Sequence, residues 1–262
     1  MPEHRRRDEE VVPFPCVGYV ILNEQAGPVN GPSATSIRVN GIDVHITVGL
    51  FAGSQIVIGH VSSGETRTLQ PAVVGAYAYG LYASGLAGPG STSIGPISPV
   101  TIGCTGGSAQ NSASGFQSPL IGSLGTVSTS ASGQITSLEA KATGQATVSN
   151  VNLLTGIISG DRVTVIAKAE WDGTGSRSGS MTLTNGKVNG RSVSSSPPPN
   201  TRINLPGIGY VIENEQYGSN NATSAAENVI AFDIHITMSN RLGLQEGTHI
   251  VMGFATASAS RY

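Results

Sequence analysis

Two Asp-x-His pairs are the residues of this chain that come nearest to a chemical site. Asp43 and His45 stand two residues apart in one alternating stretch, and Asp233 and His235 do so in another. Residues at i and i+2 of a β-strand face the same side of the sheet, so each pair places a carboxylate beside an imidazole. Such a pair supplies two of the ligands that a zinc-type site needs.

A third ligand for either pair would have to come from His60 or His249. Neither stands at a recognised ligand spacing, and both pairs lie in strongly apolar company. We therefore expect each histidine to bond its aspartate in a structural role, with no metal and no other cofactor.

The tripeptide Asn-Glu-Gln occurs twice and is the second candidate. A carboxylate between two amides could bind a cation or a sugar hydroxyl. It could equally end a strand and fix the following loop through bonds from side chain to backbone. Both copies stand in the same strand context, which favours the structural role, and the tripeptides are retained as ligand or cation candidates. The six residues are Asn23, Glu24, Gln25, Asn214, Glu215 and Gln216.

No arrangement typical of catalysis is found in the sequence. There is no convincing nucleophile elbow, zinc-protease spacing or phosphate loop. Glu139 and Glu170 are isolated carboxylates that nothing in the sequence brings together. We expect no catalytic residue and no enzymatic activity, with a hydrolase of surface polysaccharide as the weaker alternative.

Three tyrosines could form an aromatic platform for sugar rings. Tyr77 and Tyr79 share one face of a predicted strand, and strict alternation places Tyr82 on the other. Because sugar sites favour tryptophan and the chain has only Trp171, we expect these rings to pack across strands instead.

The composition is that of a β-protein poor in charge. Only 11% of the 262 residues are charged, the net charge is −2, and 35 residues are glycine. An ordinary domain carries about 25% charged residues. No basic stripe suggests nucleic-acid binding, and no window has the roughly 18 apolar residues of a membrane span.

Two further features bear on the compartment. Cys16 and Cys104 permit one disulfide in an oxidising environment, and two buried free thiols are the alternative. Residues 1–11 carry mixed charges, which predicts a mobile N-terminal segment, and lack the apolar core of a secretory leader. That counts against export unless the chain is processed or begins inside a longer product.

Alternation with period two recurs along almost the whole chain and predicts an all-β fold, a β-sandwich or jelly-roll-like module. The clearest runs are 18–23, 42–48, 55–61, 76–84, 100–104, 140–148, 162–169, 180–184, 207–213, 230–238 and 249–255. The turn signals between them are Asn30-Gly31, Asn40-Gly41, Gly88-Pro89-Gly90, Gly106-Gly107, Asp172-Gly173, Asn185-Gly186 and Asn189-Gly190.

An internal repeat divides the chain. The string Phe14–Gln25 returns as Leu205–Gln216, Ile42–Val48 returns as Phe232–Met238, and Ile56-Val-Ile-Gly59 returns as Ile250-Val-Met-Gly253. Residues 71–260 then form one complete module that contains the second copy, at 200–260. Residues 12–65 hold the first copy without the strands that precede the second one, so we expect a half-module there.

Four strings of the chain carry a family resemblance. They are Tyr79–Gly85, the Pro-Asn-Thr…Leu-Pro-Gly…Asn-Glu-Gln string within Pro198–Gln216, and the later strands Asp233–Thr237 and Ile250–Ala257. These strings resemble the choice-of-anchor P proteins, which are exported bacterial surface proteins with varied C-terminal anchors. The resemblance covers 71–260 as a module and 12–65 as the end of another. It implies an extracellular or cell-surface β-protein without established enzymatic activity, with the cell envelope as a partner.

This chain departs from that pattern at its C-terminal end. It ends at Arg261-Tyr262 without an anchor segment, and Ala257 and Ser258 stand where such proteins often carry a cysteine. We therefore expect release or self-assembly rather than anchoring.

Strands without their other half have open hydrogen-bonding edges, which something must satisfy. We therefore expect an extracellular structural protein whose main partner is itself, in a fibre or surface layer built by strand addition. A monomeric adhesin or ligand-binding module is the alternative. The residues expected to form the assembly strands are Gly18, Tyr19, Val20, Ile21, Val44, Ile46, Ile56 and Ile58.

Overall fold

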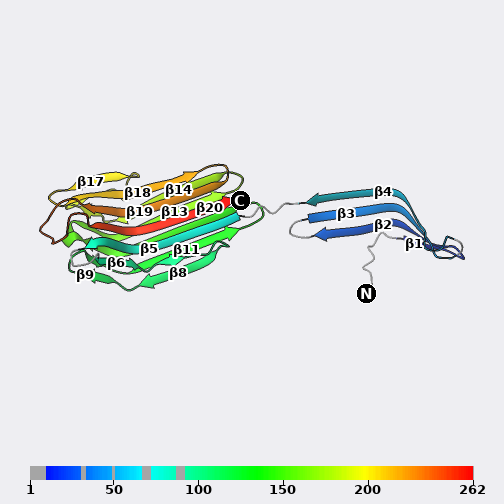
Figure 1. Ribbon diagram of the computed structural model, residues 1–262, viewed down its shortest axis with the longest axis horizontal. Coiled ribbons are helices and arrows are strands. Elements are labelled where there is room, and N and C mark those ends of the chain that lie inside the picture. Colours follow the sequence, from blue (N-terminus) through cyan, green and yellow to red (C-terminus); the bar gives the residue numbers. More distant parts are fainter. Residues whose placement is uncertain (1–9, 31–33, 49–50, 67–71, 87–91, 262) are drawn as a thin grey trace. The chain divides into compact units, whose positions relative to one another are not determined.

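The structure is a computed structural model that describes residues 10–30, 34–48, 51–66, 72–86 and 92–261 (Figure 1). Within these ranges the one helical element is the 3-10 turn η1 (Leu154–Gly156), and nearly everything else that is regular is β-strand. The all-β prediction is confirmed. No helix in the described part is long and apolar enough to cross a membrane. The chain divides into two compact units, Met1–Leu69 and Gln70–Tyr262.

The described strands of the first unit form one antiparallel sheet. Its order is β1 (Glu10–Phe14), β2 (Gly18–Asn30), β3 (Ala34–Ile46) and β4 (Gln55–Thr66). In Figure 1 these strands form a single layer.

The second unit is a β-sandwich of two sheets. One sheet runs β17 (Thr201–Leu205), β18 (Gly209–Asn220), β19 (Ser224–Ile236), β20 (His249–Arg261), β5 (Ala72–Leu86) and β6 (Thr92–Ile97), with β7 (Val100–Thr101) also paired to β5. The other runs β16 (Arg191–Ser192), β15 (Lys187–Val188), β13 (Ile158–Trp171), β12 (Ala140–Leu153), β10 (Gly122–Leu124) and β9 (Phe116–Ser118). On this second sheet β14 (Gly175–Thr184) pairs with β13, β11 (Val127–Ile135) with β12, and β8 (Gly107–Ala113) with β11.

The core of the sandwich lies between β12–β14 of one sheet and β18, β19, β20 and β5 of the other. Alternate residues point inward, and many of them are alanine or valine, so the two sheets can pack closely. The larger side chains Phe232, Ile234, Ile250 and Met252 fill the centre and are fully buried.

The two copies of the repeat fold into the same four-stranded arrangement. Gly18 pairs with Ile46 as Gly209 pairs with Ile236, and the β2–β3 pairs keep this register as far as Ala26, beyond which the first unit has a shift that the second lacks. The β3–β4 and β19–β20 ladders keep the same register in both copies. β1–β4 of the first unit therefore match β17–β20 of the second, except at the far ends of β2 and β3.

A row of irregular positions crosses each copy and corrects one predicted turn. Asn23 and Gly59 have positive φ (54° and 73°), as do Asn214 and Gly253 (50° and 68°) at the matching positions. One residue of each strand is left out of the ladder there, and the register is the same on both sides, so this irregular row is not a β-bulge with an extra residue on one strand. The prediction of a turn at Asn40-Gly41 is wrong because this dipeptide lies inside β3, on the same row.

The same row in the second unit reverses the alternation of β5. Ala76 and Ala78 are buried on one side of this row, and Leu81 and Ala83 are buried on the other. The placement of Tyr82 on the opposite face is therefore wrong, since its ring meets that of Tyr79 edge-on at 6.5 Å between centroids.

The turn signals at Asp172-Gly173, Asn185-Gly186 and Asn189-Gly190 lie between strands, as expected. The signal at Gly106-Gly107 is displaced, because the turn is formed by the two residues before it and Gly107 begins β8. Asn189 and Gly190 both have positive φ (52° and 74°) and join β15 to β16, as a two-residue hairpin requires. The signals at Gly31 and at Gly88–Gly90 lie outside the described residues.

Both cysteines are free thiols. Cys16 and Cys104 are each exposed. The expectation of buried thiols is wrong, because both residues stand in turns on the surface. A disulfide would join the two units and stays a prediction.

Candidate functional site

The first unit exposes apolar side chains that the second unit buries. Ile56 and Ile58 on β4 are 50% and 55% exposed, whereas their counterparts Ile250 and Met252 on β20 are 0% exposed. Because the registers are identical, this side of the first sheet is the one that faces the core in the second unit. We call it the open face, made of Val20, Ile42, Val44, Ile46, Ile56, Ile58 and Val61.

Exposed apolar residues are concentrated in the first unit. Its large exposed apolar residues are Phe14, Val17, Ile37, Ile42, Val48, Phe51, Ile56, Val57, Ile58 and Val61. Among the described residues of the second unit they are Leu138, Tyr217 and Met238. Those on one sheet face, among them Ile42, Ile56, Ile58 and Val61, form apolar surface of the kind typical of an interface.

The residues expected to build assembly strands do not all lie on this face. Val44, Ile46, Ile56 and Ile58 belong to the open face, as does Val20, which its neighbours already bury. Tyr19 and Ile21 point to the opposite face, where the ring of Tyr19 stacks on His45. Gly18 begins β2 beside the turn.

The two edges of the first sheet differ. β1 carries Glu10 and Pro13, residue types that hinder pairing with a further strand. The stretch Gln55–Val61 of β4 has neither proline nor lysine, and the described strands pair β4 only with β3. Its counterpart β20 has β5 on that side. The β4 edge is therefore the open one.

A third residue, His249, contacts the Asp-His pair of the second unit. Asp233 and His235 lie on β19, and His249 on β20 stands directly opposite His235. The Nε2 of His235 is 2.7 Å from Asp233 Oδ2, and the Nε2 of His249 contacts Asp233 Oδ1. The expected Asp-His contact is present, together with a second imidazole that sequence spacing did not reveal.

Stacked rings fix the orientation of these histidines. The ring of His249 lies 4.6 Å from that of His235, which in turn lies 4.7 Å from Tyr210. The guanidinium of Arg202 caps the row at 3.8 Å from the Tyr210 ring. The row crosses β17 to β20 on the outer face of the sheet.

Charge couples the members of the cluster. Burial alone would raise the pKa of Asp233, but the hydrogen bonds and charges of His249 and His235 outweigh it and hold that pKa below its ordinary value. The hydrogen bond to Asp233 raises the pKa of His249. Burial, and then the neighbouring Asp233, raise the pKa of Glu215 to about 7.

The first unit repeats the cluster with one exchange. Asp43 lies 3.3 Å from His45 Nε2, and Gln55 takes the place of the second histidine, donating from Nε2 to Asp43 at 2.5 Å. His60 does not join this pair; its Nδ1 contacts the Asn40 amide oxygen at 2.7 Å.

The Asn-Glu-Gln tripeptide separates into two roles in the second unit. The Asn214 amide donates to Pro197 O at 2.7 Å, and the Gln216 amide donates to Asn214 Oδ1 at 2.8 Å. These amides fix the preceding Pro-rich segment. Glu215 instead lies beside Asp233 on the outer face. In the first unit the Glu24 carboxylate accepts a hydrogen bond from the Asn40 amide at 2.6 Å. Asn23 has positive φ on the irregular row, and Gln25 pairs with Val39 in the ladder.

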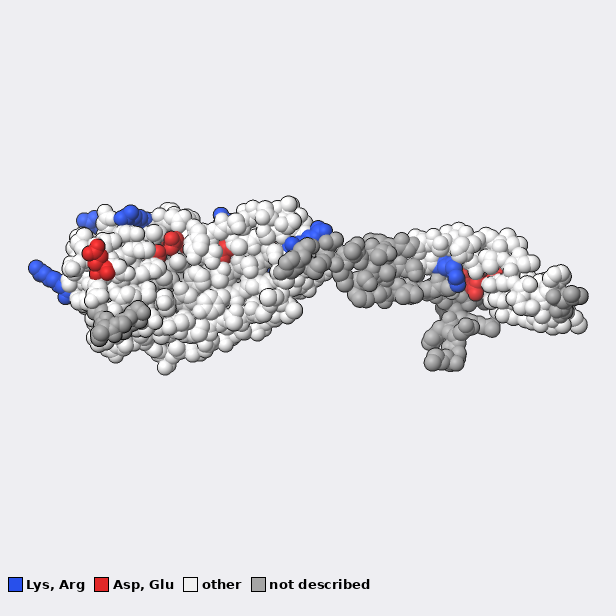
Figure 2. All heavy atoms as spheres, viewed as in Figure 1, with Lys and Arg blue, Asp and Glu red and all other residues white. Residues whose placement is uncertain are grey.

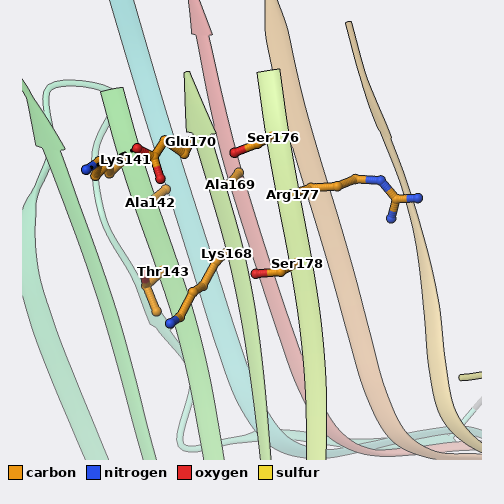
Figure 3. Close-up of a pocket in the computed structure, with 9 residues that line it drawn as sticks. All are labelled: Lys141, Ala142, Thr143, Lys168, Ala169, Glu170, Ser176, Arg177 and Ser178. Carbon is orange, nitrogen blue, oxygen red and sulfur yellow. Dashed lines mark ion pairs between the residues drawn. The ribbon is translucent and has the colours of Figure 1, made fainter. Parts of the chain in front are cut away.

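A shallow hollow lies on the outer face of β12–β14. Figure 3 shows Lys141 near Glu170, Lys168 beside Thr143, and Arg177 turning away. Lys141 Nζ lies 2.8 Å from Glu139 and 3.0 Å from Glu170, so the structure brings the two glutamates together around one lysine. Both carboxylates are thus held in ion pairs with one lysine, and the arrangement is not that of a glycosidase acid–base pair.

Two glutamates are buried at the interior face of the sandwich. Glu227 is paired with Arg177. Glu213 is 1% exposed, and its Oε1 has no hydrogen-bond partner among the described residues. Burial raises the pKa of Glu213 to about 7. Leu22 occupies the matching position of the first unit.

Comparisons with known protein families, with curated proteins and with solved structures find no match to this chain.

Proposed function

We propose that this chain is a non-enzymatic structural protein that associates with a second copy of itself through the first unit. The observation that carries the proposal is the contrast between Ile56 and Ile58, half exposed, and Ile250 and Met252, fully buried at the same register. A sheet face with the sequence of a core face needs a cover.

The second unit indicates what such a cover requires. There the matching face packs on β12, β13 and β14, whose own apolar sides are used in doing so. The outward residues of β12, such as Lys141, Thr143 and Gln145, are polar. The open face of another first unit offers apolar side chains of the right kind.

The expected gain is comparable with the cost of association. Burying a fully exposed isoleucine or valine contributes about 1.5–3 kcal/mol. Ile56, Ile58 and Val61 are roughly half exposed, so covering them in both copies contributes on the order of 5–10 kcal/mol, against a cost of about 4–15 kcal/mol. Charged side chains are few on the surface seen in Figure 2, so repulsion between copies is weak.

Strand pairing at the β4 edge would link copies a second time. A unit with two separate contact surfaces can be joined on both, so the product we propose is a fibre or surface layer. We propose an extracellular or cell-surface location on the resemblance to the choice-of-anchor P proteins, supported by the composition rich in small and hydroxylated residues.

Sedimentation velocity of the full chain tests self-association. The wild-type protein should exceed the monomer mass increasingly with concentration, and Ile56→Lys/Ile58→Lys should remain monomeric. Val57→Lys is the matched control, because Val57 lies on the same strand with its side chain on the opposite face and is 41% exposed. Circular dichroism checks that the sheet content is unchanged in each variant.

A wild-type chain that stays monomeric at every concentration would exclude assembly and leave the adhesin or ligand-binding alternative. Equal loss of association in Val57→Lys would show that the edge and not the open face makes the contact.

A further inference from the structure

The residues around Asp233 have the composition of a metal site. Two imidazoles, from His235 and His249, and two carboxylates, from Asp233 and Glu215, gather on three adjacent strands. The ligand atoms of Asp233, His235 and His249 all lie within 4.8 Å of one another. Imidazole and carboxylate together are ligands that Zn²⁺ and similar divalent ions favour.

We propose that this cluster binds one divalent transition-metal ion, of which Zn²⁺ is the representative, through Asp233, His235 and His249. Bonds of about 2.1 Å from the metal to nitrogen or oxygen place neighbouring ligand atoms of a tetrahedral ion about 3.4 Å apart. The contact of 2.7 Å between Asp233 and His235 is shorter than this spacing, so it has to open slightly to admit the ion. Such an ion would join β19 and β20 on the outer face.

The surroundings suit a metal ion. Stacking on Tyr210 holds the His235 ring in place, as ligands fixed by neighbouring groups require. The side chains of His235 and His249 are 32% and 38% exposed, which leaves a route for the ion from solvent. Asp233, in contrast, is nearly buried, so water competes little for its oxygens.

The first unit provides the comparison that separates a metal site from a hydrogen-bonded aspartate. It keeps Glu24, Asp43 and His45 but has Gln55 where the second unit has His249. An amide nitrogen donates a hydrogen bond to the aspartate and cannot ligate a metal through that nitrogen. Gln55 is therefore sufficient for folding, and His249 adds a ligand. We infer that this exchange decides which copy holds the ion.

Calorimetric titration of the full chain with Zn²⁺ tests the proposal. The exposed thiols could bind zinc themselves, so the experiment uses the chain with Cys16→Ser and Cys104→Ser. We expect one ion per chain. His249→Gln, which installs the residue of the first unit, should weaken binding by about 100-fold or more, since loss of a supporting group alone weakens metal sites by roughly 10- to 100-fold.

Gln55→His is the converse variant and should raise the stoichiometry from one ion to two. Titration with Co²⁺ adds a spectroscopic signature, because a four-coordinate ion with imidazole ligands absorbs strongly in the visible range. The fluorescence of Trp171 checks that His249→Gln leaves the second unit folded.

Three results would overturn the proposal. They are absence of Zn²⁺ binding by the wild-type sequence at submillimolar concentration, unchanged affinity in folded His249→Gln, and no added site in Gln55→His. Binding does not depend on self-association, so monomeric protein would give the same titration.

Discussion

Replacing the buried Glu213 by leucine should stabilise the second unit, and increasingly so as the pH rises. Glu213 points into the core with one oxygen unpartnered, and the first copy has Leu22 at this position. The variant therefore installs a residue that the same strand geometry already accepts. It removes a carboxyl group whose ionised form is poorly solvated in the fold.

The size of the effect follows from the pKa of Glu213, which burial raises from 4.5 to about 7. Below the unfolded pKa the carboxyl is protonated in both states, and its ionisation costs nothing. As the pH rises from 4.5 to about 7 the unfolded chain releases the proton first, so the free energy of unfolding falls. At about 1.4 kcal/mol per pKa unit, the total loss is about 3 kcal/mol.

Urea unfolding followed by the fluorescence of Trp171 measures this effect. Trp171 is the one tryptophan of the chain, is buried, and lies in the second unit. The stability difference between Glu213→Leu and wild type should grow by about 3 kcal/mol between about pH 4 and about pH 8. Glu213→Gln, also uncharged, should show the same growth without the added apolar surface. A difference that stays constant across this range would refute the reasoning.

Three further predictions concern Gly253 on the irregular row, the buried ion pair and the thiols. Gly253→Ala, at a position with φ of 68°, should lower the free energy of unfolding by about 1–2 kcal/mol, seen as a lower Tm. Arg177→Ala leaves Glu227 buried without its cation and should cost about 2–3 kcal/mol in urea unfolding, since Arg177 itself is one-third exposed. Native protein should take up two equivalents of maleimide by mass, at Cys16 and Cys104; uptake only after unfolding would contradict their exposure.

The strands of this fold are predictable because alternation of apolar and small polar residues is nearly continuous. The errors arise where the alternation reverses. Asn40-Gly41 has the residue types of a tight turn, yet Gly41 lies on the irregular row inside β3, where an added Cβ would lie 3.2 Å from the backbone oxygen of Ile58. The position of Tyr82 is lost for the same reason, since one skipped residue moves every later side chain to the other face.

The cluster around Asp233 is only half predictable. His235 is found from its spacing within one strand, whereas His249 comes from the next strand, and no local spacing reports a cross-strand register. The repeat contained a usable signal: aligning His249 with Gln55 marks a position that differs between otherwise similar strings. Glu215 is separated from its neighbouring amides by the positive φ of Asn214, which the sequence of the tripeptide does not reveal.

Hydrogen exchange as a function of protein concentration tests the central proposal most directly. We expect the amides of Ile56–Val61 that point away from β3 to exchange slowly in concentrated solution and rapidly on dilution, because a second copy covers them only when associated. The amides of β20, already paired with β5 on that side, should show no such dependence. Equal exchange of β4 at all concentrations would contradict an open face that a second copy covers.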